Sequence, residues 1–243
     1  MSDIAAPVER VLDDPCVEPC DACAARGVSI CRVLPHRQLR RLADCMVEQE
    51  FAAGATLFDD GDPGGALFNI TDGVVKLFKL MPDGRRQVIG FLFRGDFLGV
   101  SVGDHHTLWA EATTPVRTCR FPRAAFNNLL RESPELHEEL LSRAADELRV
   151  AQAQMVLLGR KTAQERLATF LVDMADRERR RGGIPGLVTL PMTRSDIADY
   201  LGLTIETVSR AVTAFETAGF VRRLHHGALA LLQPDVLARL ARI

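Results

Sequence analysis

The sequence predicts an α+β protein with a β-roll, a long dimerisation helix and a C-terminal winged helix-turn-helix. Residues 50–125 hold short β-type runs separated by glycines, and residues 134–160 hold no glycine before Gly159. Residues 192–220 suit two short helices around a tight turn. We expect four segments in order: a cysteine-rich segment over 1–34, a β-roll over 35–133, the long helix over 134–160 and the winged helix-turn-helix over 161–243.

The N-terminal segment concentrates thiols in a stretch that has no core pattern. Cys20, Cys23 and Cys31 follow the spacing C-x2-C-x7-C, and Cys16 precedes them as a reserve ligand or a spare surface thiol. Such a loop can wrap an inorganic centre, because soft thiolates select iron–sulfur clusters or zinc. A thiol–disulfide switch on Cys20 and Cys23 is a further alternative.

The cysteines are expected to be reduced. The N-terminus lacks the basic start and apolar core of a signal peptide, and no apolar run approaches the roughly 20 residues that span a bilayer. We therefore expect a cytoplasmic protein without a membrane partner, in which structural disulfides are rare.

The glycine-rich middle region predicts an antiparallel β-roll. Val74–Leu80 and Gln87–Phe93 alternate or run apolar between Asp-Gly turns such as Asp72-Gly73 and Asp83-Gly84. Upstream, Cys45 falls in an apolar helical pattern, which indicates a buried structural cysteine.

The long helix carries a heptad seam, the pattern of a parallel coiled coil. Its apolar positions recur at alternating steps of three and four: Leu141, Ala144, Leu148, Ala151, Met155 and Leu158. A helix packed only on its own β-roll is the alternative, and Val150, Val156 and Leu157 on the other face suit that packing. Because the seam is short and holds two alanines, we expect a marginal homodimer.

Residues 192–220 predict a helix-turn-helix, with which a protein places one helix in the DNA major groove. Thr193 and Asp196 form a capping signature, Gly202 supplies the turn and Thr204 caps the second helix. The side chains left facing outward on the N-terminal half of that helix are Ile205, Glu206, Ser209 and Arg210.

These outward side chains suit base edges. Arg210 can bond guanine in bidentate fashion, Glu206 can accept from cytosine, and Ile205 can meet a thymine methyl. Residues 160–243 carry 13 Lys and Arg against 9 Asp and Glu, although the whole chain has a net charge of −2. The basic excess therefore lies where phosphate attraction is needed.

Two flanking stretches complete this half of the chain. Lys161–Ala175 is expected as its first helix, and residues 177–186 as a charged and then flexible loop. The basic stretch at residues 222–226 is read as a wing that touches the DNA backbone, with a solvated turn as the alternative.

The outward face also resembles a known recognition helix. Ile205-Glu206-Thr207-Val208-Ser209-Arg210 resembles the E-x-x-S-R helix of FNR-type, FnrN/FnrL-like oxygen-sensing regulators in the CRP/FNR superfamily, and the resemblance runs from about Cys16 to near Leu232. It implies a homodimer on a double-stranded TTGAT–N4–ATCAA site, and Ser209 separates this type from the cyclic-AMP-binding branch. It also implies that β-roll loops such as Asp83–Gln87 touch RNA polymerase.

The same resemblance implies a cofactor and its fourth ligand. Thr118-Cys119-Arg120-Phe121-Pro122 resembles the strand that carries the fourth cluster cysteine, so the implied ligands are Cys20, Cys23, Cys31 and Cys119. In FNR-type proteins a [4Fe–4S] cluster forms without oxygen, permits dimerisation and DNA binding, and is degraded by oxygen. Zinc on the same thiolates is the less favoured alternative, because zinc sites usually pair two C-x-x-C units and only one is present.

The β-roll resembles the cyclic-nucleotide-binding fold, and Gly95-Asp96-Phe97-Leu98-Gly99 matches the entrance of its phosphate cassette. That cassette needs an arginine to pair with the cyclic phosphate. Residues 100–113 hold neither Arg nor Lys, so we expect no cyclic AMP binding.

Other functions remain as alternatives. A cluster-free, FixK-like or zinc- or thiol-regulated transcription factor of the same superfamily keeps the DNA binding and drops the cluster. An electron-transfer iron–sulfur protein is less favoured because of the recognition helix. No Ser/His/Asp set, Gly-rich phosphate loop or paired carboxylates support catalysis, so we expect no enzyme.

Overall fold

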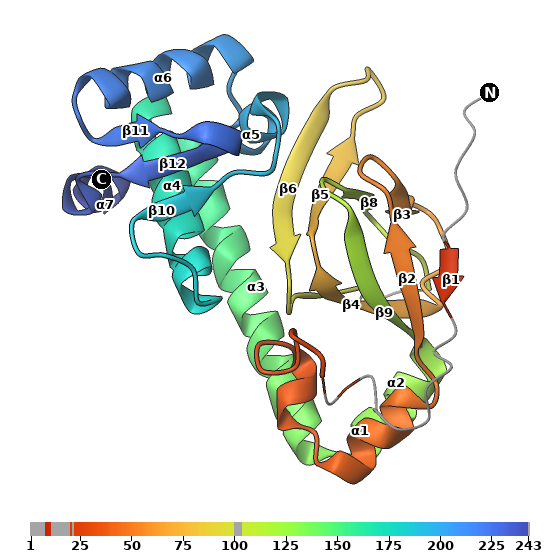
Figure 1. Cartoon of the computed structure of the whole chain (residues 1–243). Coiled ribbons are helices and arrows are strands. Elements are labelled where there is room, and N and C mark those ends of the chain that lie inside the picture. The colour runs from red at the N-terminus through yellow and green to blue at the C-terminus, as the bar shows by residue number, and fades with distance from the viewer. Residues whose placement is uncertain (1–7, 11–19, 21, 100–103, 243) are drawn as a thin grey trace. The chain divides into compact units, whose positions relative to one another are not determined.

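The computed structural model describes residues 8–10, 20, 22–99 and 104–242 (Figure 1). The chain divides into two compact units, Met1–Asp146 and Glu147–Ile243. The division falls inside helix α3, Pro134–Arg160, which has the bounds expected for the long helix. Cys16, the reserve ligand, lies outside the described residues. No described helix is long and apolar enough to cross a membrane.

The first unit is built on two antiparallel sheets (Figure 1). The first sheet has the order β1-β2-β9-β4-β7, with bounds Val8–Arg10, Val47–Phe51, Val116–Pro122, Ala66–Asp72 and Phe97–Leu98. The second has the order β3-β8-β5-β6, with bounds Thr56–Phe58, Trp109–Ala112, Val74–Leu80 and Arg86–Phe93. The predicted β-roll is confirmed.

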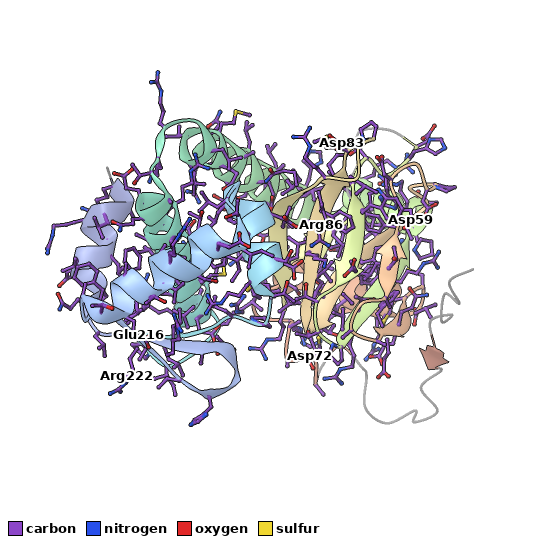
Figure 2. All side chains as sticks on the ribbon, turned by 90° about the horizontal axis from the view of Figure 1, so that it is seen from above. Asp59, Asp72, Asp83, Arg86, Glu216 and Arg222 are labelled. Carbon is purple, nitrogen blue, oxygen red and sulfur yellow. The ribbon has the colours of Figure 1, made fainter. Side chains whose placement is uncertain are left out.

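Two Asp-Gly turns join the long strands of the roll. Asp83 lies in the turn between β5 and β6, and Arg86 begins β6 (Figure 2). Gly73 joins β4 to β5 with φ +86°, and a Cβ there would lie 2.2 Å from the carbonyl oxygen of Pro115. Only glycine can occupy that turn without moving the neighbouring backbone.

Strands β4 and β9 separate two hydrophobic cores. Because side chains alternate along a strand, Phe68 and Ile70 of β4 face the core inside the roll, while Leu67 and Asn69 face the other side. The other side is covered by η1, Ile30–Val33, α1, His36–Ala43, α2, Arg123–Glu132, and the beginning of α3. This outer core is made of Ile30, Cys31, Leu34, Leu39, Leu42, Leu67, Cys119, Phe121, Phe126, Leu129 and Leu136.

The expectation for Cys45 was wrong. Helix α1 ends at Ala43, and Cys45 follows in a turn with its side chain only half-buried and its thiol 3.3 Å from the Leu42 carbonyl oxygen. The helix ends early because β2 begins at Val47, only four residues after Ala43. The backbone must change direction between these two elements, so the helix cannot continue to position 45.

The second unit combines helices with a small sheet of order β10-β12-β11. Its elements after α3 are α4 Ala163–Arg180, β10 Leu187–Thr189, α5 Arg194–Leu201, α6 Ile205–Thr217, β11 Val221–Arg223, η2 His225–Gly227, β12 Ala228–Leu231 and α7 Pro234–Arg242. Helix α4 is longer than expected, because basic side chains in its last turn pair with acidic ones, as Arg179 does with Asp176 at 2.9 Å.

Candidate functional site

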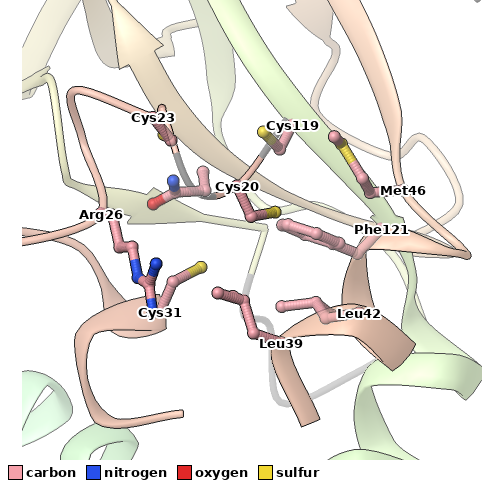
Figure 3. A pocket seen from close by; sticks show the side chains of 10 residues that line it. Cys20, Cys23, Arg26, Cys31, Leu39, Leu42, Met46, Cys119 and Phe121 are labelled. Atoms are coloured by element: carbon pink, nitrogen blue, oxygen red, sulfur yellow. The ribbon is translucent and has the colours of Figure 1, made fainter. Parts of the chain in front are cut away.

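Four thiols from two distant segments line one pocket (Figure 3). Cys20, Cys23 and Cys31 come from the N-terminal segment, and Cys119 comes from β9. The rest of the lining is mostly apolar: Leu39, Leu42, Met46 and Phe121, together with Arg26 and Asn69. The structure therefore brings together all four cysteines that the resemblance implied.

Cys119 is held more firmly than the other three. It lies on β9, the central strand of the first sheet, where it faces Glu48 of β2 and Asn69 of β4. Cys31 is the second residue of η1, whose N-cap is Ser29, and the Ser29 hydroxyl accepts the Cys31 amide at 3.2 Å. The pocket thus joins a rigid strand to a loop that is fixed by local turns.

Burial changes the acidity of two thiols. Burial, and then the negative charges of the neighbouring Cys23, Cys31 and Cys20, raise the pKa of Cys119 far above its usual value. Burial also raises the pKa of Cys31, although a hydrogen bond with Ser29 opposes this. Close thiolates repel each other, so a cationic group bound between them would favour their deprotonation.

Two polar residues of the lining were missed by the sequence analysis. The Asn69 side chain has no described hydrogen-bond partner for its Oδ1 atom, although the residue is only 1% exposed. Arg26 supplies positive charge that opposes the rise in the Cys31 pKa. Among the described residues, no three His, Cys, Asp or Glu side chains form a group that could hold a single metal ion.

A charged cluster ties the cysteine segment to α3. Arg32, next to Cys31, donates to the Glu139 carboxylate at 3.2 and 2.7 Å, and Arg143 donates to the same carboxylate at 2.8 Å. Arg143 also donates to the carbonyl oxygens of Val28 at 3.0 Å and Gly95 at 3.2 Å. Burial alone would raise the pKa of Glu139, but the hydrogen bonds from Arg32 and Arg143 outweigh it and lower that pKa.

The helix-turn-helix has the caps that the sequence predicts. The Thr193 hydroxyl accepts the Asp196 amide at 3.0 Å, and the Asp196 carboxylate accepts the Thr193 amide at 3.0 Å. Gly202 ends α5 with φ +60°, and the Thr204 hydroxyl accepts the Thr207 amide at 3.2 Å. The side chains that hold the two helices together are buried: Ile197, Ala198, Leu201, Val208, Ala211, Val212 and Phe215.

Arg166 of α4 holds the turn between α5 and α6 through its guanidinium. Its guanidinium donates to the carbonyl oxygens of Leu201 at 2.8 Å and Leu158 at 2.9 Å, and to those of Gly202 and Lys161 at 3.3 and 2.9 Å. These carbonyls lie at helix ends, where no intrahelical partner is available. The role of Arg166 could not be found from the sequence, because its partners are backbone carbonyls and no spacing rule of the sequence connects them to this side chain.

The predicted recognition face is exposed. Ile205 is 45% exposed, and Glu206, Ser209 and Arg210 are also exposed. Arg210 donates to the Thr207 hydroxyl at 3.2 Å, a contact that leaves its other donors available. In the hairpin that follows, Arg223 is held against α6 through Thr213 and Glu216, at 2.8 and 3.3 Å, while Arg222 is exposed.

Most of the predicted seam on α3 is exposed in the single chain. Leu141, Leu148 and Met155 are 66%, 60% and 71% exposed, and Ala144 and Ala151 are exposed as well. Leu158 differs, because it is half-buried next to Gly202: a Cβ on that glycine would lie 3.0 Å from Leu158 Cδ2. A stripe of large apolar side chains on one helix is typical of an interface.

Comparisons with known proteins agree with this arrangement. Residues 48–133 match the cyclic nucleotide-binding domain, and residues 165–240 match the Crp-like helix-turn-helix domain. The nitrogen fixation regulation protein FixK of Bradyrhizobium diazoefficiens is 40% identical over 91% of this chain and 93% of its own length. The transcriptional activator protein FnrL of Cereibacter sphaeroides is 35% identical over 83% of each chain.

The solved structures show the same fold. FixK2 from Bradyrhizobium japonicum superposes with a TM-score of 0.75 at 35% identity, over 80% of this chain and 96% of that one. The curated relatives are regulators, which confirms that the chain is not an enzyme. With two matching domains and full-length relatives at this identity, the chain belongs to the CRP/FNR family of DNA-binding transcription regulators.

Proposed function

We propose that the chain is a cytoplasmic, oxygen-responsive transcription activator whose four pocket cysteines hold a [4Fe–4S] cluster. The loaded protein dimerises through α3 and binds TTGAT–N4–ATCAA-like sites when oxygen is absent. One observation carries the proposal: thiols that lie far apart in the sequence meet at one apolar pocket beside the dimerisation helix.

The residues of the pocket fit such a group. Cys20, Cys23, Cys31 and Cys119 supply four soft thiolates, the ligand set of an iron–sulfur cluster. Arg26 offsets part of the negative charge that four thiolates bring. When bound, the cluster would supply a redox centre that oxygen can oxidise. The apolar side chains of the pocket would keep bulk water from its sulfur atoms.

The Arg32–Glu139–Arg143 cluster offers a route from the thiols to α3. Arg32 directly follows a cysteine ligand, and Glu139 and Arg143 lie on the first turns of the helix that carries the seam. A shift of the cysteine segment would therefore pull on a buried carboxylate and two guanidiniums. Because a marginal dimer responds to a few kcal/mol, a local change can alter its population.

DNA reading and activation complete the proposal. Glu206, Ser209 and Arg210 read base edges, and Arg222 of the wing contacts phosphates. The β5–β6 hairpin, where Asp83 pairs with Arg85 at 2.7 Å, is proposed to contact RNA polymerase. The relative FnrL is named a transcriptional activator, which supports activation here.

A cluster-free regulator is the second candidate. The relative FixK is 40% identical over nearly the whole chain, which favours a FixK-like mode of control. In that case the same cysteines act as redox-sensitive thiols or bind zinc. DNA binding would then persist in a colourless protein.

Anaerobic purification separates the two candidates. Iron, sulfide and zinc per chain, the visible spectrum and the oligomeric state are measured before and after air is admitted. We expect about four irons and four sulfides per chain, a brown absorption that bleaches in air, and loss of the dimer. A colourless protein that binds the DNA site equally well with and without air contradicts the cluster proposal and leaves the FixK-like mode.

A further inference from the structure

Asn69 is the one amide that lines the thiol pocket. It lies on β4 and is 1% exposed, and its Oδ1 atom has no hydrogen-bond partner among the described residues. A buried amide oxygen without a partner destabilises a folded chain, because it loses its bonds to water and gains none in return. Such a group at a binding pocket therefore calls for a partner that the pocket itself provides.

The sheet register places this amide beside a cysteine. Asn69 is directly opposite Cys119 in the antiparallel pair of β4 and β9, so both side chains point to the same face. Residues paired in this way have Cβ atoms about 5 Å apart. The neighbouring lining from Leu39, Leu42 and Phe121 offers no hydrogen-bonding group to the amide.

The chemistry of the amide fits sulfur. A half-turn about χ2 exchanges the amide nitrogen and oxygen without moving other atoms, so Asn69 can present either a donor or an acceptor to the pocket. Neutral thiols are weak acceptors, whereas metal-bound thiolates and inorganic sulfide carry negative charge and accept N–H bonds well. A neutral S–H in the metal-free pocket can donate only weakly to Oδ1, whereas a centre that holds the cysteines as thiolates gives the turned amide a strong acceptor for its N–H.

We propose that Asn69 donates its side-chain N–H to the sulfur of metal-bound Cys119 or to an adjacent cluster sulfide, and thereby tunes the centre. This inference rests on the proposed function of the pocket. Hydrogen bonds to sulfur stabilise the more reduced state and raise the reduction potential of a cluster. Asn69 therefore slows oxidation of the centre by oxygen, at the cost of a less stable metal-free protein.

Thr118, the residue directly before Cys119 in β9, provides a matched control. It is also 1% exposed and its hydroxyl has no described hydrogen-bond partner, but it points to the opposite face of the sheet, where it pairs with Ile70. Thr118→Val removes a buried polar group of similar cost without touching the thiol pocket. The comparison therefore separates the removal of an unpaired polar group from the loss of a bond to the centre.

The experiment compares wild type with Asn69→Leu, Asn69→Asp and Thr118→Val, each as the full chain. In the metal-free form, Asn69→Leu and Thr118→Val should both raise Tm by a few degrees. In the anaerobically loaded form, Asn69→Leu should lower the midpoint potential and bleach several-fold faster in air. Thr118→Val should match wild type in both, and Asn69→Asp should retain the least iron because it places a carboxylate against thiolates.

The outcomes are distinguishable. An Asn69→Leu protein with wild-type potential and bleaching rate overturns the inference and leaves the cluster proposal intact. If wild type binds zinc and no iron, the oxygen-sensing function fails. The inference then requires that Asn69→Leu releases zinc several-fold faster than Thr118→Val does. A wild type that binds neither metal overturns both.

Discussion

The helix ends of the helix-turn-helix and the lining of the thiol pocket differ in how far the chain satisfies their polar groups. In the helix-turn-helix, Thr193 and Asp196 cap each other and Arg166 bonds the carbonyls at the helix ends. In the pocket, Cys119 is a buried thiol with a raised pKa and Asn69 has no described partner for its amide oxygen. At its helix ends the DNA-reading region is completed within the chain, although Nη1 of Arg194 at the start of α5 is buried without a described partner. The pocket stays uncompleted, as we expect if it gains and loses the proposed cluster.

Removal of one pocket ligand should give the largest effect. Cys119→Ser should abolish the anaerobic cluster and lower anaerobic DNA affinity to its aerobic level, a loss of roughly 100-fold if the dimer population follows the cluster. Iron content and fluorescence anisotropy on the TTGAT–N4–ATCAA duplex measure this. Cys45→Ser, outside the pocket lining, should retain iron. Full iron content in Cys119→Ser would show that another group replaces this ligand.

A charge in the seam tests whether the pocket acts through dimerisation. Leu148→Glu should weaken the dimer by roughly 100-fold, because pairing would bury two like charges, and should leave iron content unchanged. Sedimentation of the anaerobic protein gives the dissociation constant. Ser142→Glu, exposed on the same helix outside the seam, is the control. Equal dimer affinities for the two variants would place the interface elsewhere.

The recognition face can be altered without touching the pocket. Arg210→Ala should lower affinity for the specific duplex by roughly 10- to 100-fold, corresponding to about 1–3 kcal/mol for one bidentate base contact. On a duplex in which the base pair contacted by Arg210 is replaced, Arg210→Ala and wild type should bind with similar affinity. Arg222→Ala should instead weaken both duplexes alike and reduce the salt dependence. A uniform loss in Arg210→Ala would reassign this residue to the phosphate backbone.

The charged cluster on α3 should give a smaller, intermediate effect. Glu139→Gln keeps the shape of the side chain but leaves Arg32 and Arg143 without a countercharge. We expect normal iron content and an anaerobic dimer weakened by roughly tenfold, consistent with about 1.4 kcal/mol of coupling free energy. Glu138→Gln, at an exposed neighbour, should behave as wild type. An unchanged dimer in Glu139→Gln would remove this cluster from the signalling route.

The smallest effect concerns a cap in the completed region. Thr193→Ala should cost about 1 kcal/mol of unfolding free energy, because the first turn of α5 loses its side-chain acceptor. The loss should be equal in the metal-free and loaded proteins, and Thr217→Ala should cost less. A cap effect that depends on the cluster would contradict the division into a completed and an uncompleted region. Denaturant unfolding of both forms provides the measurement.

The sequence predicts the features of this fold that are local. Thr193 and Asp196 are three residues apart, so their cap could be read directly, and the long helix follows from its uninterrupted pattern. Asn69 could not be found, because its position opposite Cys119 depends on the pairing of β4 with β9 across intervening strands. Arg32 and Glu139 are likewise far apart in sequence, and no spacing rule connects them. The end of α4 at Arg180 was missed because side-chain pairing extended a helix whose apolar pattern had already ended.

The central strand β9 gives the proposed cluster the character of a removable cross-link. A centre that joins Cys31 to Cys119 closes a long loop that contains most of the β-roll. In the chain-entropy model, a covalent link across a loop of this order raises the free energy of the unfolded state by roughly 4.6 kcal/mol. Loss of the cluster in oxygen would thus remove this cross-link. The unfolded chain would regain its conformational entropy, and the free energy of unfolding would fall.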